Sequence, residues 1–266
     1  MKFIRFEADN KICYGVVDGQ IAKRVSGDIF GVYEVTGDVF NLTDIRLLAP
    51  VTPPNIIAIG LNYRKHASET GAAEPPRPVI FLKATTSLLA PGGVIVLPEI
   101  APDEVDYEAE LCVVIGREAK GVSEEDALSY VFGYMCGNDV SARDCQTRLD
   151  AQWARGKSFD TFCPVGPHIE TNIADPDNLN IYSRLNGNIM QSSNTRDMIF
   201  SVRQIISYCS RSMTLLPGTL IMTGTPEGVG FARKPPVFLR DGDTIEIGVE
   251  NIGSLINKVS AHWRAQ

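Results

Sequence analysis

The chain opens with short segments in which apolar and polar residues alternate, and such alternation is typical of half-buried β-strands. Turn-forming Asp-Asn and Asp-Gly pairs separate these segments, so we expect a small N-terminal β domain over residues 1–50. Its predicted strands are 3–6, 12–17 and 20–22. Three prolines, Pro50, Pro53 and Pro54, then mark a linker into a larger domain over 55–264.

The larger segment combines apolar runs with polar loops and two helical patterns. Strands are expected at 55–60, 110–116, 220–222 and 244–250, and helices at 123–130 and from 201 onward. The second helix places Ser201 and Gln204 in the positions of a capping box. Residues 61–78 are expected to form a long polar loop, and loops of this length more often have a function than serve only as connections. Strands outnumber helices, so the expected fold class is mixed α+β and β-dominated.

The composition then excludes several classes of protein. Of 266 residues, 44% are hydrophobic and 21% are charged, as in a globular protein. The formal net charge of −7 argues against a nucleic-acid partner. No apolar run reaches the roughly 18 residues of a membrane span, and no signal-peptide pattern begins the chain, so we expect a cytoplasmic protein without a membrane partner. The six scattered cysteines form no Cys-x-x-Cys pair and are expected to be reduced and mostly buried.

An acidic segment carries the most informative chemistry. Five acids fall in the eight residues 103–110, directly before an apolar strand. Residues two apart on a strand point to the same face, so Glu108 and Glu110 should aim at one spot. Adjacent carboxylates repel, a divalent cation relieves that repulsion, and oxygen ligands favour Mg²⁺, Mn²⁺ or Ca²⁺. Asp139 is the candidate third ligand, and the alternative is that these acids form a solvated edge.

The polar loop over 61–78 holds the histidine of greatest interest. If part of this loop forms a helical turn, His66 and Glu69 are neighbours at positions i and i+3. A carboxylate beside an imidazole raises its basicity and fixes its tautomer, which suits a general base acting on water. The alternative is a surface pair without function. Of the other histidines, His168 follows a Gly-Pro pair that indicates a turn, and His262 lies near the end of the chain.

Two cationic segments and a glycine-rich loop complete the candidate chemistry. Arg143 and Lys157 could neutralise a substrate carboxylate or an enolate oxygen near the metal, or they could pair with the acids instead. Residues 223–230 follow a predicted strand but lack the Gly-Lys-Ser/Thr ending of a phosphate-binding loop, so that interpretation is rejected. Their backbone amides and the Thr225 hydroxyl could still hold a carboxylate.

Taken together, these segments resemble the fumarylacetoacetate hydrolase superfamily. The motifs follow in order over most of residues 55–260: 59–63 (IGLNY) before His66, 105–111 (VDYEAEL), 138–144 (NDVSARD), 156–162 (GKSFDTF) and 220–226 (LIMTGTP). Two late stretches look closest to the mitochondrial domain-containing members and their bacterial relatives, namely 191–195 (QSSNT) and 233–239 (RKPPVFL). Residues 1–50 loosely resemble the small N-terminal domain of that group.

The resemblance implies a β-roll catalytic domain, usually in a homodimer, with an octahedral Mg²⁺ or Mn²⁺ that Ca²⁺ could replace. The implied metal ligands are Glu108, Glu110 and Asp139. The implied substrate contacts, to a carboxylate and a carbonyl, are Arg143, Gln146 and Thr225. His66 and Glu69 would be a water-activating dyad on a lid over the substrate. Lys157 would steady the attacking water or the oxyanion.

Three functions then compete. The first is a hydrolase that cleaves a C–C bond in a small anionic 2,4-dioxo acid of the acylpyruvate or fumarylpyruvate type, through a metal-stabilised enolate. The second uses the same enolate to interconvert the keto and enol forms of oxaloacetate, or to decarboxylate it. The third is a non-catalytic binding protein that a metal stabilises. We expect the first, an enzyme in which electrostatic preorganisation dominates the rate.

Overall fold

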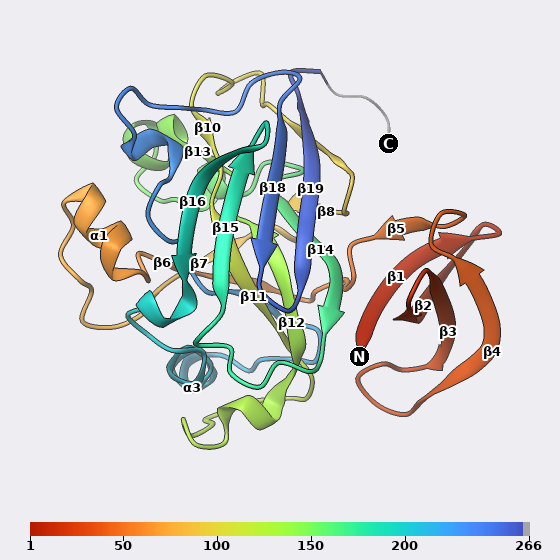
Figure 1. Ribbon diagram of the computed structural model, residues 1–266. Coiled ribbons are helices and arrows are strands. Elements are labelled where there is room, and N and C mark those ends of the chain that lie inside the picture. Colours follow the sequence, from red (N-terminus) through yellow and green to blue (C-terminus); the bar gives the residue numbers. More distant parts are fainter. Residues whose placement is uncertain (263–266) are drawn as a thin grey trace.

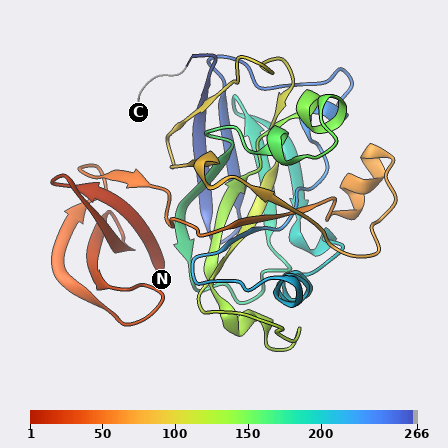
Figure 2. The same cartoon turned by 180° about the vertical axis from the view of Figure 1, so that it is seen from behind.

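The computed structural model describes residues 1–262, and its strands form two principal sheets that share one hydrophobic core (Figures 1 and 2). Short helices and 3-10 turns lie around the sheets. The predicted class, mixed α+β and β-dominated, is confirmed. None of the helices in the described part of the chain is long and apolar enough to cross a membrane.

The larger sheet has twelve strands within the described residues. Its order is β4 (Tyr33–Asn41), β3 (Ile21–Gly27), β2 (Lys11–Asp18), β1 (Lys2–Ala8), β14 (Cys163–Glu170), β12 (Val131–Asn138), β11 (Ala109–Ile115), β17 (Leu220–Met222), β6 (Ile56–Gly60) and β7 (Val79–Lys83). Two further strands join it at the side, β5 (Arg46–Leu48) on β1 and β8 (Leu88–Leu89) on β14.

The second sheet has the order β16 (Asn188–Asn194), β15 (Asn180–Leu185), β18 (Thr244–Val249), β19 (Gly253–Ser260) and β9 (Val94–Val96). A third, two-stranded sheet pairs β10 (Val105–Asp106) with β13 (Ser141–Ala142). The α-helices are α1 (Arg64–Thr70), α2 (Ala154–Lys157) and α3 (Val202–Ser212). Short 3-10 helices span Thr85–Ser87, Ala127–Tyr130, Thr195–Asp197 and Gly230–Ala232, and a π-helix spans Cys145–Leu149.

Strand β11 is buried on both faces, which explains its apolar run over 111–115. On one face, Leu111 and Val113 share a core with Ile247 of the second sheet. On the opposite face, Cys112 and Val114 belong to a separate cluster with residues of the N-terminal strands. The strand that carries Glu110 is therefore held from both sides.

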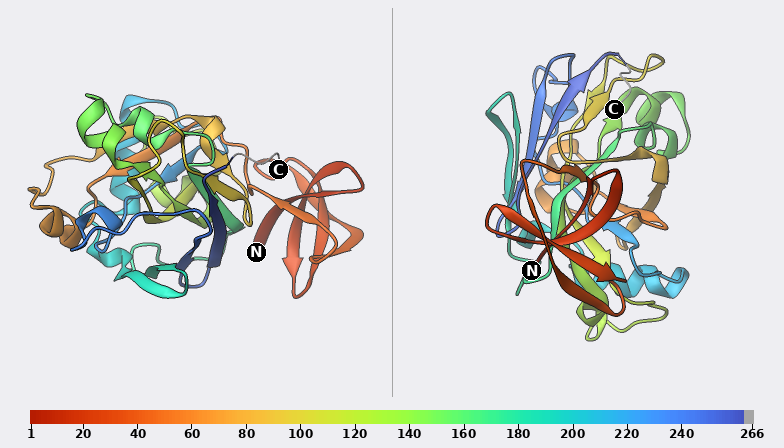
Figure 3. Two further views of the ribbon diagram at one scale, coloured as in Figure 1. Left: turned by 90° about the horizontal axis from the view of Figure 1, so that it is seen from above. Right: turned by 90° about the vertical axis from the view of Figure 1, so that its right-hand side faces the viewer.

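The N-terminal strands continue the larger sheet, because β1 pairs antiparallel with β14, with Lys2 opposite Glu170. Figure 3 shows these red and orange strands at one end of the molecule. The predicted strands at 3–6, 12–17 and 20–22 lie within or overlap β1, β2 and β3, and β4 and β5 were not predicted.

Two expected elements need correction, and a third is confirmed. The helix predicted over 123–130 is only a 3-10 turn over Ala127–Tyr130. The polar loop predicted over 61–78 contains a two-turn helix, α1, which ends at Gly71 in the left-handed conformation that glycine favours. The capping box of α3 is present as predicted, since Ser201 and Gln204 each accept the other's backbone N–H.

Candidate active site

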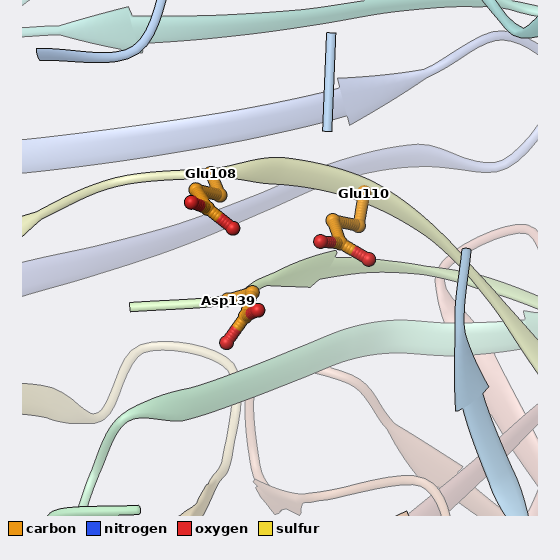
Figure 4. Close-up of side chains that lie close together, drawn as sticks. All are labelled: Glu108, Glu110 and Asp139. Carbon is orange, nitrogen blue, oxygen red and sulfur yellow. The ribbon is translucent and has the colours of Figure 1, made fainter. Parts of the chain in front are cut away.

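Three carboxylates meet where strands β11 and β12 lie side by side. Glu108 immediately precedes β11, Glu110 lies within it, and Asp139 directly follows β12. Antiparallel pairing sets Ala109 opposite Asn138, which brings the three side chains together. One oxygen of each carboxylate lies within 4.8 Å of the other two, and all three side chains are buried (Figure 4). The alternative of a solvated acidic edge is therefore excluded for these three residues.

Three buried cations contact two of these carboxylates. Lys157 Nζ lies 2.7 Å from both Glu108 Oε2 and Asp139 Oδ2. Lys83 Nζ lies 2.5 Å from Asp139 Oδ1, and Arg143 Nη1 lies 2.7 Å from Glu108 Oε1. Arg143 and Lys157 thus pair with the acids, which is one of the two roles that the sequence left open.

The charge on Glu110 is less well compensated. Its Oε2 accepts the backbone N–H of Gly224 at 2.7 Å. Burial raises the pKa of Glu110 well above its usual range, and the carboxylates of Asp139 and Glu108 raise it further. For Glu108, burial alone would also raise the pKa, but the two cations that contact it hold its pKa at about 2.

The oxygen donors fit a hard divalent cation. Four buried carboxylates, those of the cluster and of Asp106, face three buried cations, so negative charge is in excess. Glu110 Oε1 has no hydrogen-bond partner among residues 1–262. A carboxylate oxygen has two lone pairs and can bind a cation while it keeps an existing hydrogen bond. Oxygen-only donors favour Mg²⁺, Mn²⁺ or Ca²⁺ over zinc.

Helix α1 brings an imidazole to the same place. His66 Nδ1 lies 2.8 Å from Glu69 Oε1, so the predicted i, i+3 pair exists. Because a carboxylate can only accept, Nδ1 carries a proton, and in the neutral imidazole Nε2 then has the lone pair. The His66 side chain is 9% exposed and that of Glu69 is 24% exposed, so this is a partly buried pair rather than a free surface pair.

A cavity of about 240 Å³ connects these groups. Its polar and charged lining residues are His66, Thr70, Glu108, Glu110, Asp139, Arg143, Gln146, Thr147, Lys157 and Thr225. Its large apolar lining residues are Ile59, Leu61, Phe81, Trp153 and Phe231. The structure thus brings eight of the nine sequence-derived candidates to one cavity, and the ninth, Glu69, reaches it through His66.

The expected substrate contacts retain hydrogen-bonding capacity. Gln146 Oε1 accepts from Arg143 Nη1 at 2.8 Å, which leaves its amide NH₂ available. Thr225 Oγ1 accepts from Gln191 Nε2 at 2.8 Å, which leaves its hydroxyl proton available. Gln191 also accepts the backbone N–H of Ala109 at 2.9 Å, so it ties Thr225 to the acidic strand.

The backbone amides of the glycine-rich loop do hold carboxylates, but these belong to the protein itself. Gly224, Gly228 and Gly230 donate their N–H groups to Glu110, Glu69 and Asp106, respectively. The loop therefore helps to build the site rather than offering a free cradle for a ligand.

No sequence pattern indicated Lys83, Asp106 or Gln191 as residues of the site. Lys83 ends the apolar strand β7, and a lysine at the end of such a strand was the available signal. Asp106 was one of five acids in 103–110, and nothing in the sequence separates it from Asp103 and Glu104, which are less buried. Gln191 was noted only within a stretch that resembles family members.

Two family models match this chain, and together they cover most of its residues. The family model "Fumarylacetoacetate (FAA) hydrolase C-terminal" matches residues 55–260. The chain belongs to the fumarylacetoacetate hydrolase family. Residues 1–50 match a second model, "Rv2993c-like, N-terminal". The resemblance drawn from the sequence motifs is confirmed.

Members of the family that are similar to this chain carry names from two reaction classes. Rat "oxaloacetate tautomerase Fahd2a, mitochondrial" is 47% identical over 82% of this chain and 70% of its own length. The sequence of 2-hydroxyhepta-2,4-diene-1,7-dioate isomerase from Mycobacterium marinum is 40% identical to this chain, and its crystal structure matches with a TM-score of 0.88 over 98% of both chains. Fumarylacetoacetate hydrolase from Exiguobacterium antarcticum is also 40% identical, with a TM-score of 0.88 over 98% of this chain and 100% of its own.

Proposed function

We propose that this protein is a divalent-metal-dependent tautomerase that interconverts the keto and enol forms of oxaloacetate. The observation that carries the proposal is one cavity in which an imidazole of fixed tautomer and three buried carboxylates meet. The sequence alone put C–C hydrolysis first. Relatives that are 45–47% identical and are named oxaloacetate tautomerases favour the opposite order.

Tautomerisation moves one proton between C3 and the C2 oxygen of the substrate. His66 Nε2 takes the proton from C3, the electrons of that C–H bond form the C2–C3 double bond, and the carbonyl electrons move to the oxygen. The imidazolium then returns the proton to that oxygen, which gives the enol. Glu69 stabilises the imidazolium through Nδ1. Glu108, Glu110 and Asp139 would hold Mg²⁺ or Mn²⁺, which would supply Lewis-acid stabilisation of the negative charge on that oxygen.

The cations of the cavity orient the dianionic substrate. Lys157 uses two of its three N–H groups on the acids and keeps one for a substrate oxygen. The guanidinium of Arg143 lies over the ring of Phe231, 4.4 Å from its centroid, which fixes its plane at the cavity wall. Gln146 and Thr225 supply further donors to a carboxylate.

A second candidate is hydrolysis of a C–C bond in an acylpyruvate. The observation that favours it is the apolar wall of Leu61, Phe81 and Trp153, which suits an acyl group better than the second carboxylate of oxaloacetate. In this reaction His66 and Glu69 deprotonate a water that attacks the distal carbonyl, and the pyruvate enolate leaves. Both candidates rely on the same stabilisation of negative charge.

One experiment separates the candidates. Purified protein with Mg²⁺ or Mn²⁺ is incubated with enol-oxaloacetate, acetylpyruvate and fumarylpyruvate, with EDTA as the control. Loss of the enol absorbance above the buffer rate, without pyruvate, supports the tautomerase. Pyruvate from either acylpyruvate supports the hydrolase, and pyruvate with CO₂ from oxaloacetate indicates a decarboxylase. Metal binding without turnover of any of the three would overturn the proposal in favour of a binding protein.

A further inference from the structure

Asp106 is a buried carboxylate outside the three-carboxylate cluster, and it connects two parts of the cavity wall. Its Oδ1 accepts the backbone N–H groups of Tyr107 and Gly230, both at 2.8 Å. Its Oδ2 accepts the N–H of Phe231 at 3.0 Å and that of Arg143 Nε at 2.9 Å. A single side chain therefore fixes both the guanidinium of Arg143 and the loop that carries Phe231.

The same loop also contacts the helix that carries the imidazole. Lys65 and Glu69, at positions i and i+4, lie on one face of α1, which projects from the body of the protein (Figure 1). The Glu69 carboxylate accepts the N–H of Gly228, with distances of 3.1 Å to Oε1 and 2.9 Å to Oε2. Lys65 Nζ lies 3.5 Å from Glu227 Oε1. Glu69 Oε1 is also the oxygen that faces His66 Nδ1.

The end of the segment 228–231 that contacts Asp106 has little freedom to move independently of the end that contacts Glu69. A Cβ atom at Gly228, whose φ is +96°, would collide with the carbonyl oxygen of Met190. A Cβ atom at Gly230 would collide with the carbonyl oxygen of Val237 and with Asp106. Because neighbouring backbone encloses both glycines, a shift at the Asp106 end is passed along the loop to the Glu69 end.

We propose that Asp106 is a positioning residue for the reaction. It sets Arg143 by a direct ion pair, and it sets the His66–Glu69 dyad through the backbone of residues 228–231. The part of this inference that concerns rates rests on the proposed function, and the part that concerns the coupling of the loop to α1 does not.

Hydrogen exchange of the full-length protein tests the coupling without an assay of activity. Asp106→Asn keeps the size of the side chain but turns an NH₂ group toward donors. We expect the amides of 228–231 to exchange at least roughly tenfold faster, and those of α1 to exchange faster as well. Glu69→Gln should accelerate exchange in 228–231 from the other end. Glu104→Gln, which removes the half-buried carboxylate partner of Arg148, should change neither segment.

The result that overturns the coupling is faster exchange in 228–231 of Asp106→Asn with no change in α1. If Asp106→Asn accelerates exchange throughout the chain, its effect on α1 is not specific, and the Glu69→Gln variant provides the test. If Glu69→Gln does not change exchange in 228–231, the coupling is also overturned. These outcomes hold whatever reaction the protein catalyses, so they remain distinguishable from failure of the proposed function.

Steady-state kinetics test the effect on the reaction. We expect Asp106→Asn to raise KM and lower kcat together, because it disturbs both a substrate contact and the base. A merely structural role would reduce the active fraction and leave KM unchanged. The kcat of the double variant Asp106→Asn/Glu69→Gln should be little lower than that of the less active single variant, since both substitutions act on the same His66–Glu69 dyad. Fully multiplicative losses in kcat would overturn this part of the inference.

Discussion

Glu110 accepts the backbone N–H of Gly224 at 2.7 Å, and within residues 1–262 this is the hydrogen bond that its buried carboxylate makes. The carboxylates of Glu108 and Asp139 lie beside it and are each paired with two cations. The uncompensated charge of the cluster therefore lies on Glu110, and this is where a divalent cation would relieve the most repulsion.

Replacing Glu110 by Gln should have opposite effects on the metal-free and the metal-bound protein. Without metal, Glu110→Gln should be more stable than the wild type, because the wild type must either bury a poorly compensated charge or take up a proton to neutralise it. The affinity of Glu110→Gln for Mn²⁺ should fall by more than roughly 10–100-fold, which is the usual loss when a residue that hydrogen-bonds to a metal ligand is mutated. Thermal denaturation with and without EDTA measures the stability, and calorimetric titration with Mn²⁺ measures the affinity. Glu104→Gln is the control, and an unchanged Mn²⁺ affinity of Glu110→Gln would contradict the assignment.

Removal of the imidazole should slow proton transfer and leave the metal site intact. We expect His66→Ala to lower kcat on enol-oxaloacetate by roughly 10²–10⁴-fold, the usual contribution of a general base, with unchanged Mn²⁺ affinity. His262→Ala, at an exposed histidine that does not line the cavity, is the matched control. Tautomerase activity retained in His66→Ala would show that this imidazole is not the base. If neither form hydrolysed an acylpyruvate, the hydrolase candidate would also be excluded.

Lys83 should matter for folding more than any exposed lysine. Its side chain is 0% exposed and pairs with Asp139, so Lys83→Met leaves a buried carboxylate with one cation fewer. Breaking a buried ion pair costs on the order of 3–5 kcal/mol of unfolding free energy. Lys23→Met, which breaks an exposed pair with Asp18, should have no measurable effect. Urea denaturation of the metal-free protein compares them, and equal stability of the two variants would refute the role of Lys83.

His168 should make the protein less stable in mild acid. Burial lowers the pKa of His168 to about 4, with help from the positive charge of Lys2, and its buried Nε2 has no hydrogen-bond partner among residues 1–262. Well above pH 6.5 this histidine is neutral in both the folded and the unfolded chain. As the pH falls toward 4, only the unfolded chain takes up the proton, so stability falls, by up to about 2 kcal/mol between pH 7 and pH 5.

The variant His168→Leu isolates that contribution. Its unfolding free energy should decline less than that of the wild type between pH 7 and pH 5, and the difference between the two slopes is the effect of His168. Urea midpoints at each pH provide the measurement. Parallel pH profiles of the two proteins would mean that His168 titrates alike in both states.

The sequence determined the features that depend on residues close together in the chain. The i, i+2 spacing of Glu108 and Glu110, the i, i+3 spacing of His66 and Glu69, and the capping box at Ser201 all follow from local backbone geometry, and all are present in the structure. The motifs, read in order, also gave the family, because several short matches in one order are specific. The net charge of −7 indicated nothing about the cavity, where buried cations and acids pair locally.

Only the tertiary structure decided which cations and amides compensate those acids. Lys83 reaches Asp139 across 56 positions, and Gly230 reaches Asp106 across 124. No local pattern encodes such contacts, because strand order in the sheets and the path of the glycine-rich loop bring these residues together. Burial likewise separates Asp106 from the exposed Asp103, since an acid removed from water must find partners while an exposed one need not.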